Sequence, residues 1–406
     1  MTGTRSSSSA SARVETRFRD AMFSYAPTPL RVLVRGEGAR VWDDQGVEYL
    51  DFLAGIAVNA LGHAHPAFVE AVSRQAGTLA HVSNYFASEP QLELAERLKR
   101  LTGGDAVFFG NSGTEVIEAA IKVSRRTGRT RILALEKSFH GRSTGALALT
   151  GKEAYRTPFE PLIPGPEFLP TTIEALEDAM GPDVAALVLE PIKGEAGVLD
   201  LPPGYLRRAR ELTAQHGALL VLDEIQTGAG RTGEWFAFQA EQIVPDLVAL
   251  AKGIGGGFPI GALVAFGAAK DLLRPGDHGT TFGGNPLATA TANAVLGEIE
   301  RAGLVENARV MGERIRAGLH ALEHPAITDV SGRGLLVGVG LTGPQAGAVA
   351  ARALELGLIV NAAAEDRIRL APPLTITAAD VDHFLDLFTQ ALSTSEPLAA
   401  TESSDS

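Results

Sequence analysis

Short, unbroken apolar runs alternate along most of the chain with longer segments whose apolar residues recur at intervals of three and four. Such runs are typical of strands buried on both faces of a parallel sheet, and the periodic segments predict amphipathic helices. The predicted strands are residues 106–109, 131–135, 183–189, 218–222, 246–251 and 261–266. The predicted helices are residues 66–79, 89–101, 115–126, 203–216 and 286–302. This alternation predicts an α/β fold with a mostly parallel sheet.

The pattern changes after residue 302, where shorter elements follow one another closely. The predicted helices there are 305–322, 344–356 and 377–392, and the strands are 327–330, 334–341, 359–360 and 368–371. A hairpin with its turn at residues 44–46 is predicted near the other end of the chain. Because 406 residues are too many for one small core, we expect two domains. The predicted division is a disordered N-terminal arm (1–24), an N-terminal segment packing with the small domain (25–60), a large domain (61–295), a small C-terminal α+β domain (296–392) and a loose tail (393–406).

Composition narrows the function classes. The net charge of −12 argues against general nucleic-acid binding. No apolar run approaches the ~20 residues that a membrane helix needs. The chain has no cysteine, which excludes disulfides and thiolate metal sites and is typical of a cytoplasmic protein. We therefore expect a cytoplasmic protein without membrane or nucleic-acid partners.

Charged side chains follow two neighbouring predicted strands. The strand 218–222 ends in Asp223 and Glu224, and the strand 246–251 ends in Lys252, before a glycine-rich loop. Parallel strands bring their carboxyl ends to one sheet edge, where ligands bind. A lysine and a carboxylate so placed suit pyridoxal 5′-phosphate (PLP), whose aldehyde bonds to a lysine and whose ring nitrogen pairs with an acid. Either residue taken alone could be structural.

A second candidate site is the loop between strand 106–109 and the following helix. It contains Ser112, Gly113 and Thr114, and free backbone N–H groups at a helix start bind anions such as phosphate. An ordinary helix cap is the alternative. Two nucleotide-binding patterns fail: residues 145–152 lack the spacing and the final hydroxyl of a P-loop, and residues 253–258 lack the third glycine of a dinucleotide fingerprint. His63 and His65 have no third ligand near them in the sequence, so a turn is expected there rather than a metal site.

Six motifs occur in one order along the chain. They are Asn111-Ser-Gly-Thr-Glu115, Phe139-His-Gly-Arg142, Glu190-Pro-Ile-Lys-Gly-Glu195, Leu222-Asp-Glu-Ile-Gln-Thr-Gly228, Ala251-Lys-Gly253 and His278-Gly-Thr-Thr-Phe-Gly-Gly-Asn-Pro286. Together they closely resemble the class III, fold-type-I PLP aminotransferases, from about residue 25 to about residue 392. Three further segments, 58–66, 82–84 and 230–233, resemble the members that act on N2-acetylornithine.

The resemblance implies a role for each matching residue on the cofactor side. Lys252 is the expected Schiff-base lysine and proton shuttle, and Asp223 the acid that keeps the PLP ring nitrogen protonated. Gln226 would bond the ring hydroxyl, Phe139 would stack on the ring, and Glu224 is a further predicted cofactor contact. The phosphate contacts would be Ser112, Gly113, Thr114 and, from a neighbouring subunit, Thr281. Shared sites of this kind imply a homodimer.

On the substrate side, the resemblance implies that Arg142 forks the carboxylate of the amino donor, with Thr280 and Tyr25 beside the substrate. Arg369 would bind the α-carboxylate of glutamate or 2-oxoglutarate, and Glu195 would pair with Arg369 in the other half-reaction. A plain structural ion pair is the alternative. The chain departs from the family pattern at Lys193, where glutamine is common, and at three apolar helix positions, Val116, Ile117 and Ile121.

The implied reaction is transamination between N2-acetylornithine and 2-oxoglutarate, giving N-acetylglutamate 5-semialdehyde and glutamate. Ornithine, 4-aminobutyrate, succinylornithine or lysine as amino donor are the alternatives within the same site. A PLP-sensing transcription regulator is the alternative of another class. Such regulators add a basic helix-turn-helix segment before the aminotransferase-like part, and no such pattern precedes Tyr25.

Overall fold

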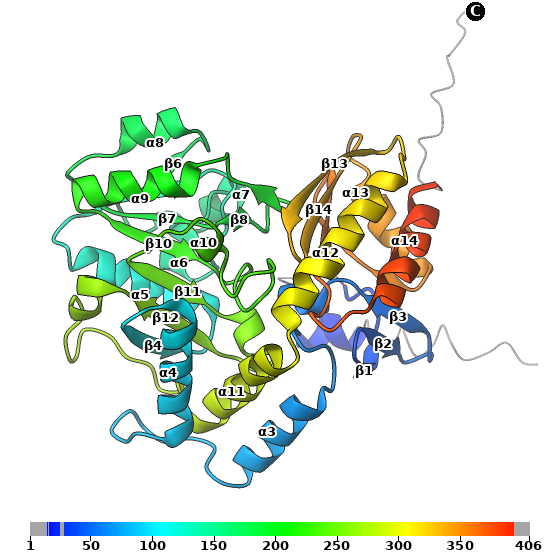
Figure 1. The fold of residues 1–406 in the computed structure, drawn as a ribbon, viewed down its shortest axis with the longest axis horizontal. Coiled ribbons are helices and arrows are strands. Elements are labelled where there is room, and N and C mark those ends of the chain that lie inside the picture. The colour runs from blue at the N-terminus through cyan, green and yellow to red at the C-terminus, as the bar shows by residue number, and fades with distance from the viewer. Residues whose placement is uncertain (1–13, 15, 25–27, 394–406) are drawn as a thin grey trace, which may run out of the picture.

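Seven strands form the central sheet of the protein. The structure, a computed structural model, describes residues 14, 16–24 and 28–393 (Figure 1). The spatial order of the central strands is β4-β12-β11-β10-β7-β5-β6. Their bounds are Ala106–Gly110 (β4), Arg131–Leu135 (β5), Pro166–Leu169 (β6), Val184–Leu189 (β7), Leu219–Asp223 (β10), Leu247–Leu250 (β11) and Gly261–Ala265 (β12). β10 runs parallel to β7 and β11, whereas β12 runs antiparallel to both of its neighbours. The predicted mostly parallel α/β sheet is confirmed.

Alternate side chains of the central strands enter two different cores. Leu220 and Leu222 of β10 belong to the larger hydrophobic cluster, whereas Val221 between them belongs to a second cluster on the opposite face. Both faces are therefore covered, which explains why these strands are unbroken apolar runs in the sequence. The second face is covered mainly by α5, whose buried residues include Val116, Ile117 and Ile121. The three departures from the family pattern on this helix thus pack into the core.

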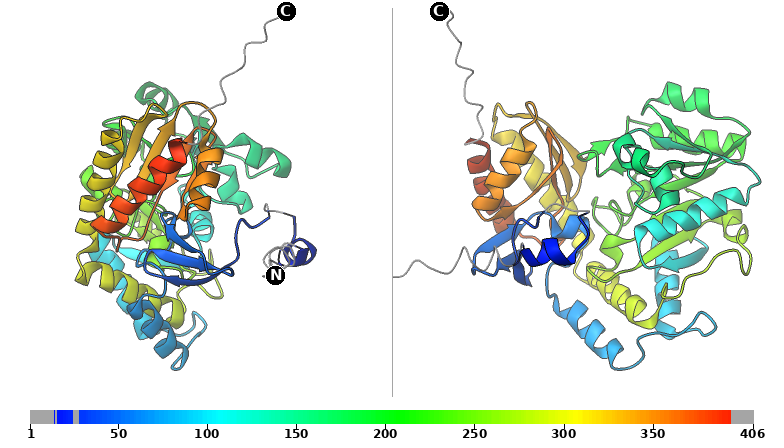
Figure 2. Two further views of the ribbon diagram at one scale, coloured as in Figure 1. Left: turned by 90° about the vertical axis from the view of Figure 1, so that its right-hand side faces the viewer. Right: turned by 180° about the vertical axis from the view of Figure 1, so that it is seen from behind.

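Helices cover both faces of this sheet (Figures 1 and 2). The helices of this part of the chain are Pro66–Ala76 (α3), Glu89–Thr102 (α4), Gly113–Arg125 (α5), Thr144–Ala148 (α6), Glu153–Arg156 (α7), Ile173–Ala179 (α8), Tyr205–His216 (α9), Ala237–Ala240 (α10) and Pro286–Arg301 (α11). Of these, α3 packs against α11 rather than against the sheet. Shorter elements are Ala54–Ala57 (α2), Ile192–Lys193 (β8), Leu199–Asp200 (β9) and the 3₁₀ turns Thr157–Phe159 (η1), Lys252–Ile254 (η2) and Gly267–Asp271 (η3). Within the described ranges, no helix is long and apolar enough to cross a membrane.

A second body lies beside the large sheet and is reached through α12 (Leu304–Ala321) (Figure 1). Its sheet has the order β13-β14-β17-β16. The bounds are Ile327–Arg333 (β13), Leu336–Leu341 (β14), Asn361–Ala364 (β16) and Arg367–Leu370 (β17), with helices Ala346–Glu355 (α13) and Ala378–Ser393 (α14). This is the α+β texture that the sequence predicts after residue 302. The α+β arrangement begins after the end of α11, whereas the predicted domain boundary at 295/296 lies inside that helix.

The N-terminal segment joins this second body through a shared sheet. The strands β1 (Leu33–Glu37), β2 (Arg40–Asp43), β3 (Glu48–Asp51) and β15 (Leu358–Ile359) form it in the order β1-β2-β3-β15. Leu358 of β15 pairs with Leu50 of β3, and Phe52 stacks on Phe384 of α14 with ring centroids 4.4 Å apart. Chain segments that are far apart in sequence therefore hold each other in place.

The two histidines singled out in the sequence have structural partners. His63 lies 2.9 Å from Asp51 between Nε2 and Oδ2, and His65 caps α3 by accepting the N–H of Ala67. No cluster of three or more potential metal-ligating side chains occurs among residues 14, 16–24 and 28–393. Tyr25, predicted beside the substrate, lies outside the described residues.

Candidate active site

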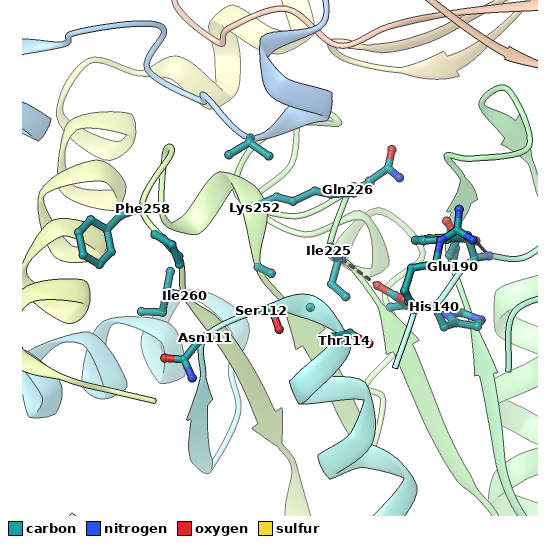
Figure 3. A pocket seen from close by; sticks show the side chains of 18 of the residues that line it. Asn111, Ser112, Thr114, His140, Glu190, Ile225, Gln226, Lys252, Phe258 and Ile260 are labelled. Carbon is teal, nitrogen blue, oxygen red and sulfur yellow. Dashed lines mark hydrogen bonds and ion pairs between the residues drawn. The ribbon is translucent and has the colours of Figure 1, made fainter. Parts of the chain in front are cut away.

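A cavity of about 480 Å³ opens at the carboxyl edge of the central sheet (Figure 3). Of the residues predicted for the site, it is lined by Ser112, Gly113, Thr114, Phe139, Arg142, Asp223, Gln226 and Lys252. They come from the ends of β4, β5, β10 and β11 and from the start of α5. The acid and the amine on which the sequence argument depends therefore face the same cavity.

Lys252 places a buried amine in the cavity. It follows β11 with a left-handed backbone, φ +45°, which turns the chain out of the strand. No side chain in the described part of the chain forms a hydrogen bond or ion pair with its amine. Burial lowers the pKa of Lys252 from 10.5 to about 8, although Glu195, Asp223 and Glu190 oppose this shift. A larger share of neutral, nucleophilic amine at neutral pH follows.

Asp223 is fixed by two hydrogen bonds at the floor of the cavity. Its Oδ2 lies 2.8 Å from Nδ1 of His140, and its Oδ1 accepts the N–H of Ile225 at 3.1 Å. The carboxylate is 4% exposed, and a protonated ring nitrogen in the cavity would give it one further hydrogen-bond donor. His140 belongs to the motif 139–142, but its contact with Asp223 could not be predicted from that motif.

Glu190 is a second buried carboxylate that sequence reasoning did not assign. It lines the cavity and accepts the N–H groups of Phe139 at 2.9 Å and of Gly194 at 3.1 Å. Burial raises the pKa of Glu190 to about 7, against the opposing effects of His140 and the two backbone donors. One carboxylate thus ties the predicted ring-stacking residue to the turn that carries Glu195.

The start of α5 forms an anion cradle (Figure 3). Ser112 is the N-cap and accepts the N–H of Glu115. The N–H groups of Gly113 and Thr114 are at the first helical positions, where a helix has no internal acceptor for them. A Cβ at Gly113 would lie 2.7 Å from Cδ1 of Ile225, so a larger residue there would force the cradle or the Ile225 side chain to move. The Thr114 hydroxyl is already paired with Ser143, with oxygens 2.6 Å apart, so its N–H is the free donor.

Glu195, Gln226 and Arg369 form one network beside the cavity. Arg369 Nη1 donates to Glu195 Oε1 and, at 3.1 Å, to Gln226 Oε1, while its Nη2 donates to Asn361 at 2.9 Å. Arg369 is 1% exposed, and its Nε has no partner among the residues that the structure describes. Burial alone would raise the pKa of Glu195, but Arg369, Lys252 and Gln226 hold it below its ordinary value. Glu195 is therefore a charged partner of a buried guanidinium, and its own side chain is 31% exposed.

Several predicted residues are not brought to this cavity. Glu224 faces the other side of β10, where its carboxylate accepts the N–H groups of Ala237 and Phe238 and the hydroxyl of Thr227. Thr280 accepts hydrogen bonds from Asn111 and Gly283, and Thr281 is exposed on the same loop. Lys193 is buried in a polar niche and donates to the carbonyl of Glu136.

The residues present fit PLP on three independent observations. A free amine stands where an aldehyde could be captured, a fixed carboxylate stands where a ring nitrogen could be held, and a helix start with free N–H groups offers a phosphate site. Phe139 and Ile225 add apolar surface to the same cavity.

Comparison with known proteins agrees with this geometry. The family described as aminotransferase class-III matches residues 23–392. The acetylornithine aminotransferase of Streptomyces coelicolor is 53% identical over 372 residues, which is 91% of this chain and 92% of that protein. The crystal structure of N-acetylornithine aminotransferase from Stenotrophomonas maltophilia is 40% identical, with a TM-score of 0.80 over 91% of this chain and 97% of that one. An ornithine aminotransferase from Toxoplasma gondii, whose structure has PLP at partial occupancy in its active site, has a TM-score of 0.88 and 33% identity over 93% of each chain. The chain belongs to the class III aminotransferases, enzymes of the PLP fold type I that use pyridoxal 5′-phosphate as their cofactor.

Proposed function

We propose that this aminotransferase exchanges the amino group between N2-acetylornithine and 2-oxoglutarate, giving N-acetylglutamate 5-semialdehyde and glutamate, a step of arginine biosynthesis. The observation that carries the substrate assignment is the near full-length match to acetylornithine aminotransferases at about half identity. The arrangement of the two arginines at the site supports it.

Each residue of the cavity has a task in this proposal. PLP, when bound, supplies a carbonyl that captures the substrate amine and a ring that withdraws electrons from the substrate Cα. Lys252 removes the proton from the substrate Cα as a base and then gives it back as an acid within the same half-reaction. General acid–base catalysis of this kind typically raises the rate ~10²–10⁴-fold. Asp223, held by His140 and Ile225, keeps the ring nitrogen protonated. Gly113 and Thr114 hold the phosphate.

The two arginines explain how one site can accept substrates with one or two carboxylates. Arg142 lines the cavity and serves the carboxylate that both substrates share. Arg369 is covered by Glu195 when the monocarboxylate acetylornithine is bound. Glutamate and 2-oxoglutarate bring a second carboxylate, which displaces Glu195 and takes over Arg369.

A cytoplasmic homodimer is part of the proposal. Thr281 is exposed and does not line the cavity that contains Lys252, as expected if it serves the phosphate of a partner subunit. Tyr85, Phe86 and Phe282 are large and exposed side chains in the same region, where His81 lies 5.2 Å from the Phe282 ring. Exposed apolar groups of this size are typical of an interface. Light scattering of the purified protein should give twice the mass of 42.5 kDa.

The test is a panel of amino donors with 2-oxoglutarate. Acetylornithine should give the highest kcat/KM, ahead of ornithine, 4-aminobutyrate, succinylornithine and lysine. A clear preference for free ornithine would replace the proposal by the second candidate, ornithine aminotransferase, which the structural likeness to the Toxoplasma gondii enzyme favours. A Lys252→Ala variant should have no steady-state turnover with any donor.

A further inference from the structure

Arg142 is held in an unusual way for a guanidinium that lines an active-site cavity. Within the described ranges it has no hydrogen bond and no carboxylate partner. Its contacts are two aromatic rings: the Cζ atom lies 3.7 Å from the centroid of Tyr155 and 5.6 Å from that of Phe139. A ring face attracts a cation without using its N–H donors. The guanidinium is therefore positioned while all of its donors stay available.

Tyr155 reaches this position from outside the cavity. It belongs to the short helix α7 and lines a neighbouring cavity of about 510 Å³, which shares Phe139 with the first one. Besides its stack with Arg142, the tyrosine contacts Lys152, whose Nζ donates to the phenol oxygen at 3.4 Å. The phenol makes no other hydrogen bond in the described part of the chain. The interaction of Tyr155 with Arg142 is therefore made by its ring and not by its hydroxyl.

The need for such a holder follows from the exposure of Arg142. The residue lines the cavity but is exposed and does not pack into the core. A long, exposed side chain loses rotamer freedom when it binds a ligand, and that loss weakens binding. A carboxylate partner would also fix Arg142, but it would compete with the substrate, as Glu195 does at Arg369. An aromatic ring fixes the side chain without this competition.

We propose that Tyr155 is a specificity-determining positioning residue: its ring pre-orients Arg142, and the site depends on it most for substrates with a single carboxylate. This inference rests on the proposed function for its choice of substrates. An acyl-ornithine has only one carboxylate, so Arg142 is its sole cationic anchor. A dicarboxylate such as 2-oxoglutarate can also bind Arg369, so it loses a smaller share of its binding when Arg142 is loosened.

The test replaces the ring and keeps the bulk. In a Tyr155→Leu variant of the holoenzyme, KM for acetylornithine should rise about threefold to tenfold, the range expected for one cation–π contact. KM for 2-oxoglutarate should rise by less than half that factor, while kcat and the visible absorption of the bound cofactor stay near the parent values. Tyr155→Phe, which keeps the ring, should restore the KM for acetylornithine.

A matched control is available in the same region. Arg156 lies 4.1 Å from the ring centroid of Phe168, a pair of the same kind that faces away from the cavity. A Phe168→Leu variant should leave both KM values unchanged. Equal rises of both KM values in Tyr155→Leu, or an unchanged KM for acetylornithine, would overturn the inference.

The outcome is separable from that of the proposed function. If the parent enzyme prefers another monocarboxylate donor in the panel, the proposed substrate is wrong, and the Tyr155 comparison is made with that donor. If Tyr155→Leu then shows the same selective rise in KM, the positioning role stands without the acetylornithine assignment. If no selective rise occurs with the preferred donor, the positioning role is wrong whatever the substrate.

Discussion

Replacing Glu195 by glutamine should reveal whether it acts as a displaceable cover for Arg369. The side chain of Glu195 is 31% exposed, whereas that of Arg369 is 2% exposed. Fully exposed ion pairs contribute ~0–1 kcal/mol, and breaking fully buried ones costs ~3–5 kcal/mol. A half-covered pair belongs between these limits, at about 1.5 kcal/mol. Glutamine keeps the shape and one acceptor, so Arg369 stays hydrogen-bonded to Gln226 and Asn361 but loses its counter-charge.

Only one of the two half-reactions should change when it is measured alone. A second substrate carboxylate no longer has to displace a charged competitor, so KM for 2-oxoglutarate should fall roughly tenfold, the equivalent of about 1.4 kcal/mol. The half-reaction with acetylornithine should keep its rate within about twofold when measured alone. Added 2-oxoglutarate should inhibit it at roughly tenfold lower concentration, because Arg369 is now uncovered.

Stopped-flow absorbance of the bound cofactor measures each half-reaction separately. The matched control is Asp329→Asn, which removes the counter-charge from Arg367, two positions before Arg369 on β17, where the Nη2 to Oδ2 distance is 2.9 Å. That variant should leave both half-reactions unchanged. An unaltered KM for 2-oxoglutarate in Glu195→Gln, with a lowered melting temperature, would show that the pair is only structural.

Further changes test the other parts of the site. A Gly113→Ala variant should bind PLP at least tenfold more weakly, because its Cβ would meet Ile225 at 2.7 Å and push the cradle away. Fluorescence titration of the apoprotein measures this affinity. An unchanged affinity would contradict the phosphate role of Gly113. The rate at which the apoprotein captures PLP should rise with pH and level off above about pH 8. The reason is that the pKa of Lys252 is lowered to about 8 and only the neutral amine attacks the aldehyde. A rate still rising toward pH 10 would refute the lowered pKa. A His140→Phe variant should lose about tenfold in kcat, since Asp223 loses a charge-assisted hydrogen bond worth ~1.5–3 kcal/mol, and a parent-like kcat would leave His140 without a part in the reaction.

The central sheet could be predicted because its strands are buried on both faces. Residues 131–135 were predicted with the bounds that β5 has, and no end of β7, β10 or β11 differs from its predicted position by more than one residue. The same property hides strand direction. A strand such as β12 is apolar throughout whether it runs parallel or antiparallel, so its antiparallel pairing with β4 and β11 left no trace in the sequence.

The candidate site was predictable where a motif fixes the backbone and less so where packing decides. Asp223 and Glu224 stand side by side at a strand end, and successive strand side chains point to opposite faces, so only one of them could reach the cavity. The sequence alone does not say which one. Val221 packs against the face covered by α5, and Asp223 continues its row toward the anion cradle. Glu224 turns to the other face, where it anchors the start of α10.

Contacts between distant segments were beyond sequence reasoning. The hydrogen bond from the N–H of Phe139 to Glu190, which joins residues 51 positions apart, is set by the fold rather than by a local pattern. The Tyr155 ring over Arg142 is of the same kind, because no spacing rule places α7 beside the motif 139–142. β1 was missed because its side chains are largely exposed and show no apolar run.

The pairing of β3 with β15 sets an order on how the protein can be built. During synthesis, Leu50 cannot pair until Leu358, about 300 positions later, has been added. A ribosome adding ~5–20 residues per second needs roughly 15–60 s for this. Val58, which follows this strand, lines the cavity. The nascent chain can therefore assemble the seven-stranded sheet, with its amine and its acid, well before the wall that encloses them exists. Until the last segment emerges, the enzyme has its reactive groups but no closed chamber in which to use them.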